Sequence, residues 1–181
     1  MKNVCLRETF NFEDVRLKNF VHLTDEAEII RKWRNNPKIR RWMFSDHIIT
    51  PEEHRSFLKK LNEDDKNFYW LVENNEGICL GVVYLNKVDF KNKSAYLGVY
   101  SNPESVIKGK GQVLLNHLLK VAFEKANLYK VKLEVFEDNG RALSLYERNG
   151  FIEEDRLKKH VFRDGSWLNV IVLGLLNKNG S

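Results

Sequence analysis

The sequence predicts an α/β fold in which helices cover a twisted mixed sheet, and three observations predict it. The chain has 181 residues, a length that suits one domain, so we expect a single domain over residues 1–181. It is 43% hydrophobic and 12% aromatic, which is enough apolar surface to form a core. The hydrophobic repeat changes along the chain between helical and strand periods, as is typical of mixed α/β folds.

Two helices are expected before the first strong strand pattern. Thr24 is the predicted N-cap of one, with acidic residues in its first turn, and Pro37 requires it to end by residue 36. The second starts at Thr50, because threonine at the N-cap, proline at the first position and Glu53 at the third form a capping box. The predicted buried residues are Ile29, Ile30 and Trp33 in the first helix and Phe57, Leu58 and Leu61 in the second.

Strands are expected at residues 67–73, 78–88 and 94–100, as neighbours joined by short turns and therefore antiparallel. A long amphipathic helix follows, carried by apolar residues at helical spacing from 114 to 126. A strand at 131–136, a short helix at 139–148 and strands at 151–157 and 167–176 complete the prediction.

The composition excludes several classes of protein. The longest apolar-plus-glycine run near the end of the chain, residues 170–176, has seven residues against the roughly 20 that a membrane helix needs, so no membrane partner is expected. The two cysteines, Cys5 and Cys79, make no disulfide framework, and no cluster has zinc spacing, so no metal is expected. The charged N-terminus lacks the apolar core of a signal peptide, which predicts a cytoplasmic protein.

The formal net charge of +5 favours an anionic partner without naming one. A basic run is present at residues 31–41, formed by Arg31, Lys32, Arg34, Lys38, Arg40 and Arg41. A nucleic-acid-binding protein would use such a run, but the cations are interspersed with 25 acidic residues and no nucleic-acid motif is present. We therefore expect no nucleic-acid partner.

The segment before the long helix has the features of a phosphate-binding loop. Its glycines allow a tight turn and a close backbone approach, and free N–H groups at a helix start favour a phosphate or pyrophosphate. It matches neither the P-loop nor the dinucleotide fingerprint, and the alternative is an ordinary connecting loop. Its residues are Lys108, Gly109, Lys110, Gly111, Gln112 and Val113.

A second segment presents one helix face. Asn139 and Tyr146 are seven residues apart, which is two helical turns, and the small Ala142 lies between them. Such a face can pass a slim ligand chain and present a phenol at its end. The alternative is that Tyr146 packs in the core with its hydroxyl at the edge.

Together these segments resemble the GNAT superfamily of acetyl-CoA-dependent N-acetyltransferases, over nearly the whole chain. In that family a [Q/R]-x-x-G-x-[G/A] loop holds the pyrophosphate of coenzyme A. Here Gly111 matches the central glycine, while Lys108 replaces the first residue and Val113 the small last one. The resemblance implies acetyl-CoA as co-substrate and a central sheet of about seven strands flanked by about four helices.

The same resemblance assigns roles to further residues. The family's N-x-x-A-x-x-x-Y helix matches Asn139, Ala142 and Tyr146 without a gap, and its tyrosine is the general acid that protonates the departing thiolate. The family's strand before the loop pairs with the pantetheine arm, which implies that Leu97, Gly98 and Val99 bind the cofactor.

The first half of the chain narrows the resemblance further. Its W-R-N-x-P segment and the residues that follow resemble the flagellin-glycosylation branch, whose members acetylate the 4-amine of UDP-4-amino-4,6-dideoxy-N-acetyl-β-L-altrosamine in pseudaminic acid biosynthesis. We therefore expect a UDP-amino sugar as acceptor and leave a homodimer open. The implied acceptor contacts are Arg34, Trp42, Met43, His54, Asn86, Lys87 and Tyr100.

The general base is not fixed by the sequence. His54 has the side chain best suited to proton transfer near neutral pH, and it is predicted as base or as substrate contact. His47, Asp46 and Glu134 are rivals. Two other functions also stay open: acetylation of a protein N-terminus or polyamine, and a non-catalytic coenzyme A sensor.

Overall fold

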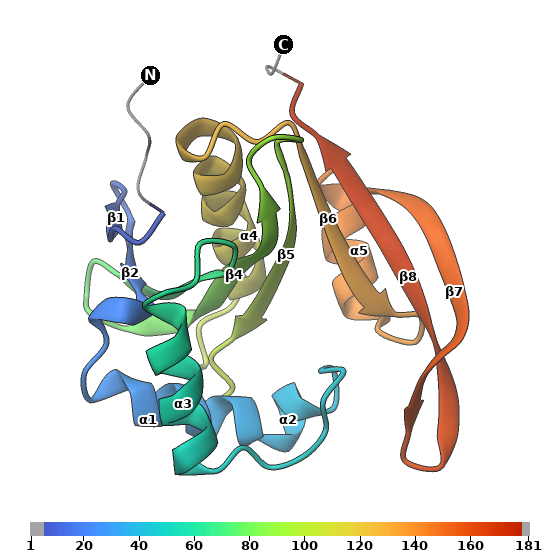
Figure 1. The fold of residues 1–181 in the computed structure, drawn as a ribbon, viewed down its shortest axis with the longest axis horizontal. Coiled ribbons are helices and arrows are strands. Elements are labelled where there is room, and N and C mark those ends of the chain that lie inside the picture. The colour runs from blue at the N-terminus through green and yellow to red at the C-terminus, as the bar shows by residue number, and fades with distance from the viewer. Residues whose placement is uncertain (1–5, 179–181) are drawn as a thin grey trace.

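The computed structural model describes residues 6–178 and is built on one sheet with the strand order β1-β2-β3-β4-β5-β6-β8-β7 (Figure 1). The predicted mixed α/β sheet is confirmed. Neighbouring strands from β1 to β5 are antiparallel, β5 and β6 are parallel, and β8 is antiparallel to both β6 and β7. The described residues form eight strands and five α-helices, against about seven and about four expected.

The elements not predicted are short or follow a proline. They are the strands β1 (Phe10–Asn11) and β2 (Val15–Asn19), the 3₁₀ turn η1 (Phe20–His22) and the helix α2 (Pro37–Arg40). The remaining strands are β3 (Phe68–Asn74), β4 (Cys79–Asp89), β5 (Ser94–Ser101), β6 (Lys130–Phe136), β7 (Ile152–Arg163) and β8 (Ser166–Leu176). The remaining helices are α1 (Glu26–Asn35), α3 (Pro51–Leu61), α4 (Lys110–Lys120) with its π-helical continuation η2 (Val121–Lys125), and α5 (Gly140–Arg148).

The two predicted N-terminal helices differ in how well they were anticipated. In α3 the capping box is present: the Thr50 hydroxyl accepts from the Glu53 amide, and the Glu53 carboxylate accepts from the Thr50 amide. In α1 the prediction of Thr24 as N-cap is wrong, because Asp25 occupies that position and the Thr24 hydroxyl binds the Glu26 carboxylate. Ile29 is 43% exposed, so its predicted burial is also wrong. Cys5 lies outside the described residues.

Each face of the sheet has its own apolar core. On one face α4 and α5 pack through residues such as Leu114, Leu118 and Tyr146. On the other face α1 and α3 pack through Ile30 and Leu61 against the first half of the sheet. In Figure 1 α1, α2 and α3 lie below the splayed strands, so they face the end of the sheet where it opens.

The sheet opens between its two parallel strands. Strands β5 and β6 pair only where Ser94–Tyr96 meets Lys130–Lys132, and beyond that point they diverge (Figure 1). The backbone groups of Leu97 to Ser101 on the β6 side are therefore left without a strand partner, and they can bind an extended ligand as an added strand would.

Two searches of the described residues give negative results. None of their helices is long and apolar enough to cross a bilayer. Among residues 6–178 no group of three or more His, Cys, Asp or Glu side chains is arranged to hold a metal ion.

Candidate active site

The predicted phosphate loop forms the first turn of α4. Gly109 is the N-cap with a φ of 76°, a left-handed conformation that favours glycine, and no side chain caps the helix. Its carbonyl accepts from the amides of Gln112 and Val113, at 3.0 and 3.3 Å. Within the helix, the amides of Lys110 and Gly111 have no acceptor, and with the helix dipole they make a site for an anion.

The loop's side chains have separate tasks. Lys108 is exposed, whereas the Lys110 ammonium donates to the Ser105 carbonyl and burial lowers its pKa. The Gln112 amide exchanges hydrogen bonds with Asn149, at 2.7 and 3.1 Å, which ties α4 to α5. A Cβ on Gly111 would meet Leu145 of α5 at 3.4 Å. The backbone of the loop and the exposed Lys108 side chain are therefore the parts that can approach a ligand.

Helix α5 places Tyr146 as predicted, on the same helix as Asn139 and Ala142. The Asn139 side chain is the N-cap and accepts from the Ala142 amide at 3.3 Å. Tyr146 is only 6% exposed and packs edge-on against Phe151, with ring centroids 5.5 Å apart. Burial, and less strongly the nearby Tyr84, raise the pKa of Tyr146, so its phenol stays protonated at neutral pH.

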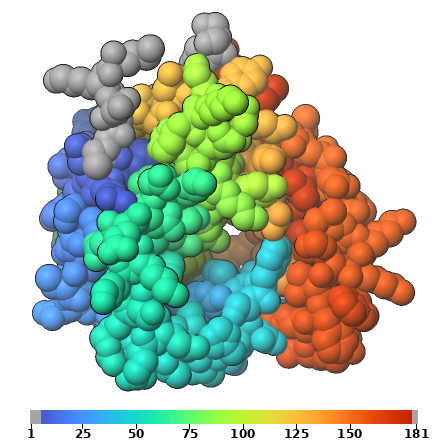
Figure 2. Space-filling model, in the orientation of Figure 1, coloured from blue at the N-terminus to red at the C-terminus, as the bar shows by residue number. Residues whose placement is uncertain are grey.

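A cavity of about 430 Å³ lies on the opposite face, under α1, α3 and the segment 41–50. Figure 2 shows the molecule hollowed at its centre, between this segment, the strand β5 and the C-terminal strands. All seven predicted acceptor contacts line it, together with Leu97 and Glu134 at the opening between β5 and β6. They are Arg34, Trp42, Met43, His54, Asn86, Lys87 and Tyr100.

The basic run 31–41 builds the wall of this cavity. Three of its arginines donate to main-chain carbonyls of the segment 41–50: Arg31 to Ile49, Arg34 to Ser45 and Arg40 to Asp46. The Asn35 side chain adds two further hydrogen bonds to the backbone of Ile49. Arg31, Arg34 and Arg40 therefore hold an irregular segment in place. Arg41, the fourth arginine of the run, is exposed.

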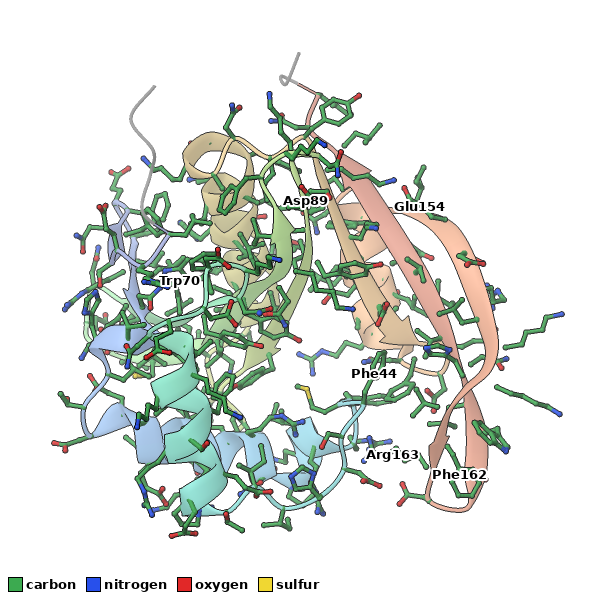
Figure 3. The ribbon with its side chains drawn as sticks, viewed as in Figure 1. Phe44, Trp70, Asp89, Glu154, Phe162 and Arg163 are labelled. Carbon is green, nitrogen blue, oxygen red and sulfur yellow. The ribbon has the colours of Figure 1, made fainter. Side chains whose placement is uncertain are left out.

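The C-terminal hairpin closes the same wall from the other side. Arg163 is buried, and its guanidinium donates to the carbonyls of Arg41 and Met43 at 3.1 and 2.5 Å. Phe44 packs against Phe136 of β6, with ring centroids 5.1 Å apart. Figure 3 labels Phe44 and Arg163 where the segment 41–50 meets the C-terminal strands. The segment 41–50 is thus fixed to the basic run on one side and to β6 and the C-terminal hairpin on the other.

We expect Arg163→Met to weaken acceptor binding without affecting the cofactor. Hydrogen bonds to a charged group are worth about 2 kcal/mol, so the variant loses roughly this much unfolding free energy in urea and its acceptor KM rises about tenfold. The KM for acetyl-CoA should not change, and Lys158→Met, an exposed change on the same hairpin, is the control. Equal changes in both KM values would contradict the assigned role.

Two buried polar atoms of residues that line the cavity have no hydrogen-bond partner within residues 6–178. One is a guanidinium nitrogen of Arg34, and the other is the side-chain oxygen of Asn86. The side-chain nitrogen of Asn86 does have a partner, since it donates to the Tyr69 hydroxyl at 2.9 Å. Burial lowers the pKa of Arg34, but an arginine remains charged. A buried donor and a buried acceptor left open indicate a ligand that carries both kinds of group.

A tier of tyrosines on β3, β4 and β5 forms the floor. Tyr69 stacks on Tyr84 with ring centroids 4.9 Å apart, and Tyr84 lies opposite Gly98 in the strand register. The Tyr84 ring covers Gly98 so closely that a Cβ there would lie 2.1 Å from it. Burial raises the pKa of Tyr84 to about 12 and raises that of Tyr100 as well, so these phenols are neutral donors.

The four candidates for the general base differ in whether they line the cavity. His54 and Glu134 line the cavity, whereas His47 and Asp46 are exposed and do not line it. His47 instead lies 3.4 Å from the Glu53 carboxylate and 2.8 Å from the Ser45 hydroxyl. Burial, and secondarily the nearby Arg31, lower the pKa of His54, so the ring is neutral near pH 7 and able to accept a proton.

The shifted His54 pKa predicts acid sensitivity of the fold. Its folded pKa lies below the unfolded value of 6.5, so the unfolded chain binds the proton more readily and stability falls as the pH drops below 6.5. One proton gives a slope of at most about 1.4 kcal/mol per pH unit. Urea unfolding between pH 7.5 and 5 should show a smaller dependence of the unfolding free energy on pH for His54→Gln than for the wild type.

Several lining residues were not predicted, namely Phe20, Ile49, Phe57, Tyr69, Tyr84 and Tyr96. The strand period could have found two of them, Tyr84 and Tyr96, from the predicted residues Asn86 and Tyr100. Tyr84 and Asn86 are two apart on β4, and Tyr96 and Tyr100 are four apart on β5, so each pair shares a face. The others, and Arg163, come from contacts that no local pattern reveals.

Comparison with known proteins agrees with this geometry. The model of the acetyltransferase (GNAT) family matches residues 28–151. The acetyltransferase PseH of Campylobacter jejuni is 41% identical over 150 residues, covering 81% of this chain and 92% of the relative.

Two solved structures share the fold. The Campylobacter jejuni N-acetyltransferase PseH in complex with acetyl coenzyme A aligns with a TM-score of 0.69 and 33% identity, covering 91% of this chain and 99% of that one. The spermidine N-acetyltransferase of Vibrio cholerae in complex with CoA and spermine aligns with a TM-score of 0.83 and 27% identity, covering 90% and 95%.

Proposed function

Since the chain belongs to the acetyltransferase (GNAT) family, we propose that it acetylates the 4-amine of a UDP-linked 4-amino-4,6-dideoxy sugar. Its activity as an acetyl-CoA-dependent N-acetyltransferase follows from the family and from the PseH relatives. The acceptor is the further step, taken from the 41% identity to PseH and from the character of the cavity. The same identity supports a place in pseudaminic acid biosynthesis and flagellin glycosylation.

The chain's own residues fit acetyl-CoA on the α4 and α5 side of the sheet. The amides of Lys110 and Gly111 at the start of α4 suit the pyrophosphate, and the free backbone edge of Leu97 to Ser101 suits the amide-bearing arm. Ala142 faces the same side with a small side chain. When bound, acetyl-CoA supplies an acetyl group activated as a thioester.

The observation that carries the acceptor assignment is the pair of unpartnered polar atoms on Arg34 and Asn86. A sugar with hydroxyl and N-acetyl groups offers an acceptor to the guanidinium and a donor to the amide oxygen. A polyamine offers only donors and positive charge, and Arg34 and Lys87 would repel it. Glu134 is the one acid lining the cavity within the described residues.

We assign the proton donor, the stabilisation of the carbonyl oxygen and the proton acceptor of the acetyl transfer to different residues around the opening between β5 and β6. The protonated Tyr146 phenol, on the cofactor side, donates the proton that the leaving thiolate needs. Backbone N–H groups near Val99 and Tyr100 stabilise negative charge on the transferring carbonyl oxygen. On the acceptor side we propose that the neutral His54 ring or the Glu134 carboxylate, which both line the cavity, takes the amine proton.

The test is acceptor specificity with the purified enzyme. UDP-4-amino-4,6-dideoxy-N-acetyl-β-L-altrosamine, spermidine and a peptide with a free N-terminus are compared at equal concentration by release of free coenzyme A. We expect kcat/KM for the UDP-sugar to exceed the others by about 100-fold or more, a margin that differential transition-state binding of polar groups readily gives. Faster turnover of spermidine would replace the proposal with a polyamine acetyltransferase.

Two statements on cellular context belong to the same proposal. A cytoplasmic location is proposed because nucleotide sugars and acetyl-CoA are made there. A homodimer is supported by Phe162 and Trp167 on the β7–β8 hairpin, which are 60% and 58% exposed with their rings in contact. Light scattering on a sizing column measures the assembly directly.

A further inference from the structure

We propose that Gln112 and Asn149 are positioning residues for the acetyl transfer, which set the distance between the phosphate-binding turn of α4 and the Tyr146 phenol of α5. The two helices lie behind the sheet, on the two sides of the opening between β5 and β6 (Figure 1). The proposal rests on the proposed function, from which it takes the place of the pyrophosphate at α4 and the role of Tyr146 as proton donor.

The side chains of Gln112 and Asn149 exchange a reciprocal pair of hydrogen bonds. The Gln112 nitrogen donates to the Asn149 oxygen at 2.7 Å, and the Asn149 nitrogen donates to the Gln112 oxygen at 3.1 Å. Both bonds are partly buried and join residues 37 positions apart in the chain. Among residues 6–178 these are the hydrogen bonds that connect α4 with α5, so the spacing of the two helices depends on this pair and on apolar packing.

On α4 the pair is attached to the turn that presents free amides. The Gln112 amide donates to the Gly109 carbonyl at 3.0 Å, and Gln112 directly follows Lys110 and Gly111, whose amides start the helix. A Cβ on Gly111 would meet Leu145 of α5 at 3.4 Å, so the glycine lets the helices approach each other at this same point. A shift of Gln112 relative to α5 therefore moves the proposed pyrophosphate site by a similar amount.

On α5 the pair is attached to the turn that contains Tyr146. The Asn149 side-chain nitrogen also donates to the Leu145 carbonyl at 2.7 Å, and the Asn149 backbone amide donates to the Tyr146 carbonyl at 3.0 Å. The Phe151 amide donates to the same carbonyl at 3.1 Å, and the Phe151 ring packs edge-on against the Tyr146 ring. The segment that Gln112 holds thus sets both the backbone and the ring of the proposed proton donor.

The cofactor makes the distance between these two places matter for the rate. Coenzyme A joins its pyrophosphate to the reacting sulfur through an arm of fixed covalent length. When the pyrophosphate is held at α4, the sulfur meets the Tyr146 phenol only if α5 lies at the matching distance. A misplacement of about 1 Å can cost about 100-fold in rate, so two neutral hydrogen bonds can affect catalysis far more than they affect stability.

The experiment compares two acetyl donors, with the acceptor that the specificity test identifies. Acetyl-CoA carries the pyrophosphate, whereas S-acetyl-N-acetylcysteamine has the same thioester on a short arm without it. Gln112→Asn shortens the pair by one methylene and Asn149→Gln lengthens it by one. We expect each change to lower kcat/KM for acetyl-CoA about tenfold, and for the short donor by less than about twofold, because the short donor is not anchored at α4.

The variant that carries both changes is the rescue. It keeps the two amide groups and their combined length, so its kcat/KM for acetyl-CoA should return to within about threefold of the wild type, which is a strong non-additive coupling. Additive losses in this variant would overturn the proposal. If the short donor reacts too slowly to be measured, the recovery decides alone.

Asn116→Ala is the matched control. Asn116 accepts from the Gln112 side chain at 2.7 Å, but both residues are on α4, so this bond joins no second helix. The control should keep the wild-type kcat/KM with both donors. Equal losses with both donors in the single variants would mean that the pair only stabilises the fold. A wild type that acetylates a different amine would overturn the proposed acceptor and leave this proposal standing, because only the donors are compared.

Discussion

Replacing Tyr146 with phenylalanine is expected to lower kcat by about 100-fold or more while the KM for acetyl-CoA changes little. A positioned general acid contributes a factor of this order, and the thiolate leaves slowly without a proton. The ring is buried against Phe151, and its hydroxyl has no hydrogen-bond partner within residues 6–178. Removing that oxygen therefore preserves the packing and deletes only the proton donor.

The matched control is Tyr129→Phe, because Tyr129 is exposed and lies away from the cavity. A solvent-derived proton can replace the phenol at low pH, so the rate of Tyr146→Phe should recover partly as the pH falls. If the kcat of Tyr146→Phe stays at the wild-type level at every pH, Tyr146 has only a structural role.

What the sequence predicted well depends on local interactions. The capping box at Thr50, the glycine turn at Gly109 and the two-turn spacing of Asn139 and Tyr146 each concern residues within one or two helical turns. Their side chains and backbone dictate the outcome with little help from the rest of the chain. The same holds for the strands from β3 to β6, whose apolar runs leave few alternatives.

What the sequence could not show depends on distant contacts. Arg163 donates to residues about 120 positions earlier in the chain, and no periodic pattern links a hairpin tip to a loop. The charge of the basic run 31–41 is visible in the sequence, whereas the main-chain carbonyls that its arginines bind are not. The strand β1 has only two residues, too few for a period to appear, whereas the alternation in β2, with Val15 and Leu17 buried and Arg16 exposed, is a local signal that could have predicted it.

These contacts explain how the positively charged residues of the chain serve both its structure and its proposed ligand sites. The arginines of the run fix the cavity wall, so most of their charge is used by the protein's own carbonyls. Lys87 lines the cavity, and Lys108 keeps an exposed charge at the start of the α4 loop. Part of the positive charge is therefore used within the structure, and part is left at the two places that we propose for the anionic groups of the cofactor and the acceptor.

The second large effect is expected from Gly98→Ala. The strand there has an ordinary φ, so glycine is required by space and not by conformation. An added Cβ would lie 2.1 Å from the Tyr84 ring and 2.2 Å from its hydroxyl, far inside the contact distance. The ring is stacked on Tyr69, so its remaining free direction is into the cavity.

We expect this variant to fold with a loss of about 2 kcal/mol, as overpacked sites do, and to lose most acetyl transfer through a raised acceptor KM. Gly140→Ala is the steric control, since a Cβ there meets nothing within 4 Å. The decisive measurement is a double-mutant cycle with Tyr84→Ala. If the tyrosine ring is what excludes a side chain, Gly98→Ala costs almost nothing in unfolding free energy in the Tyr84→Ala background, which gives a coupling of about 2 kcal/mol. Additive losses would mean instead that a side chain on β5 disturbs the backbone edge itself, and coenzyme A affinity would then fall in both backgrounds.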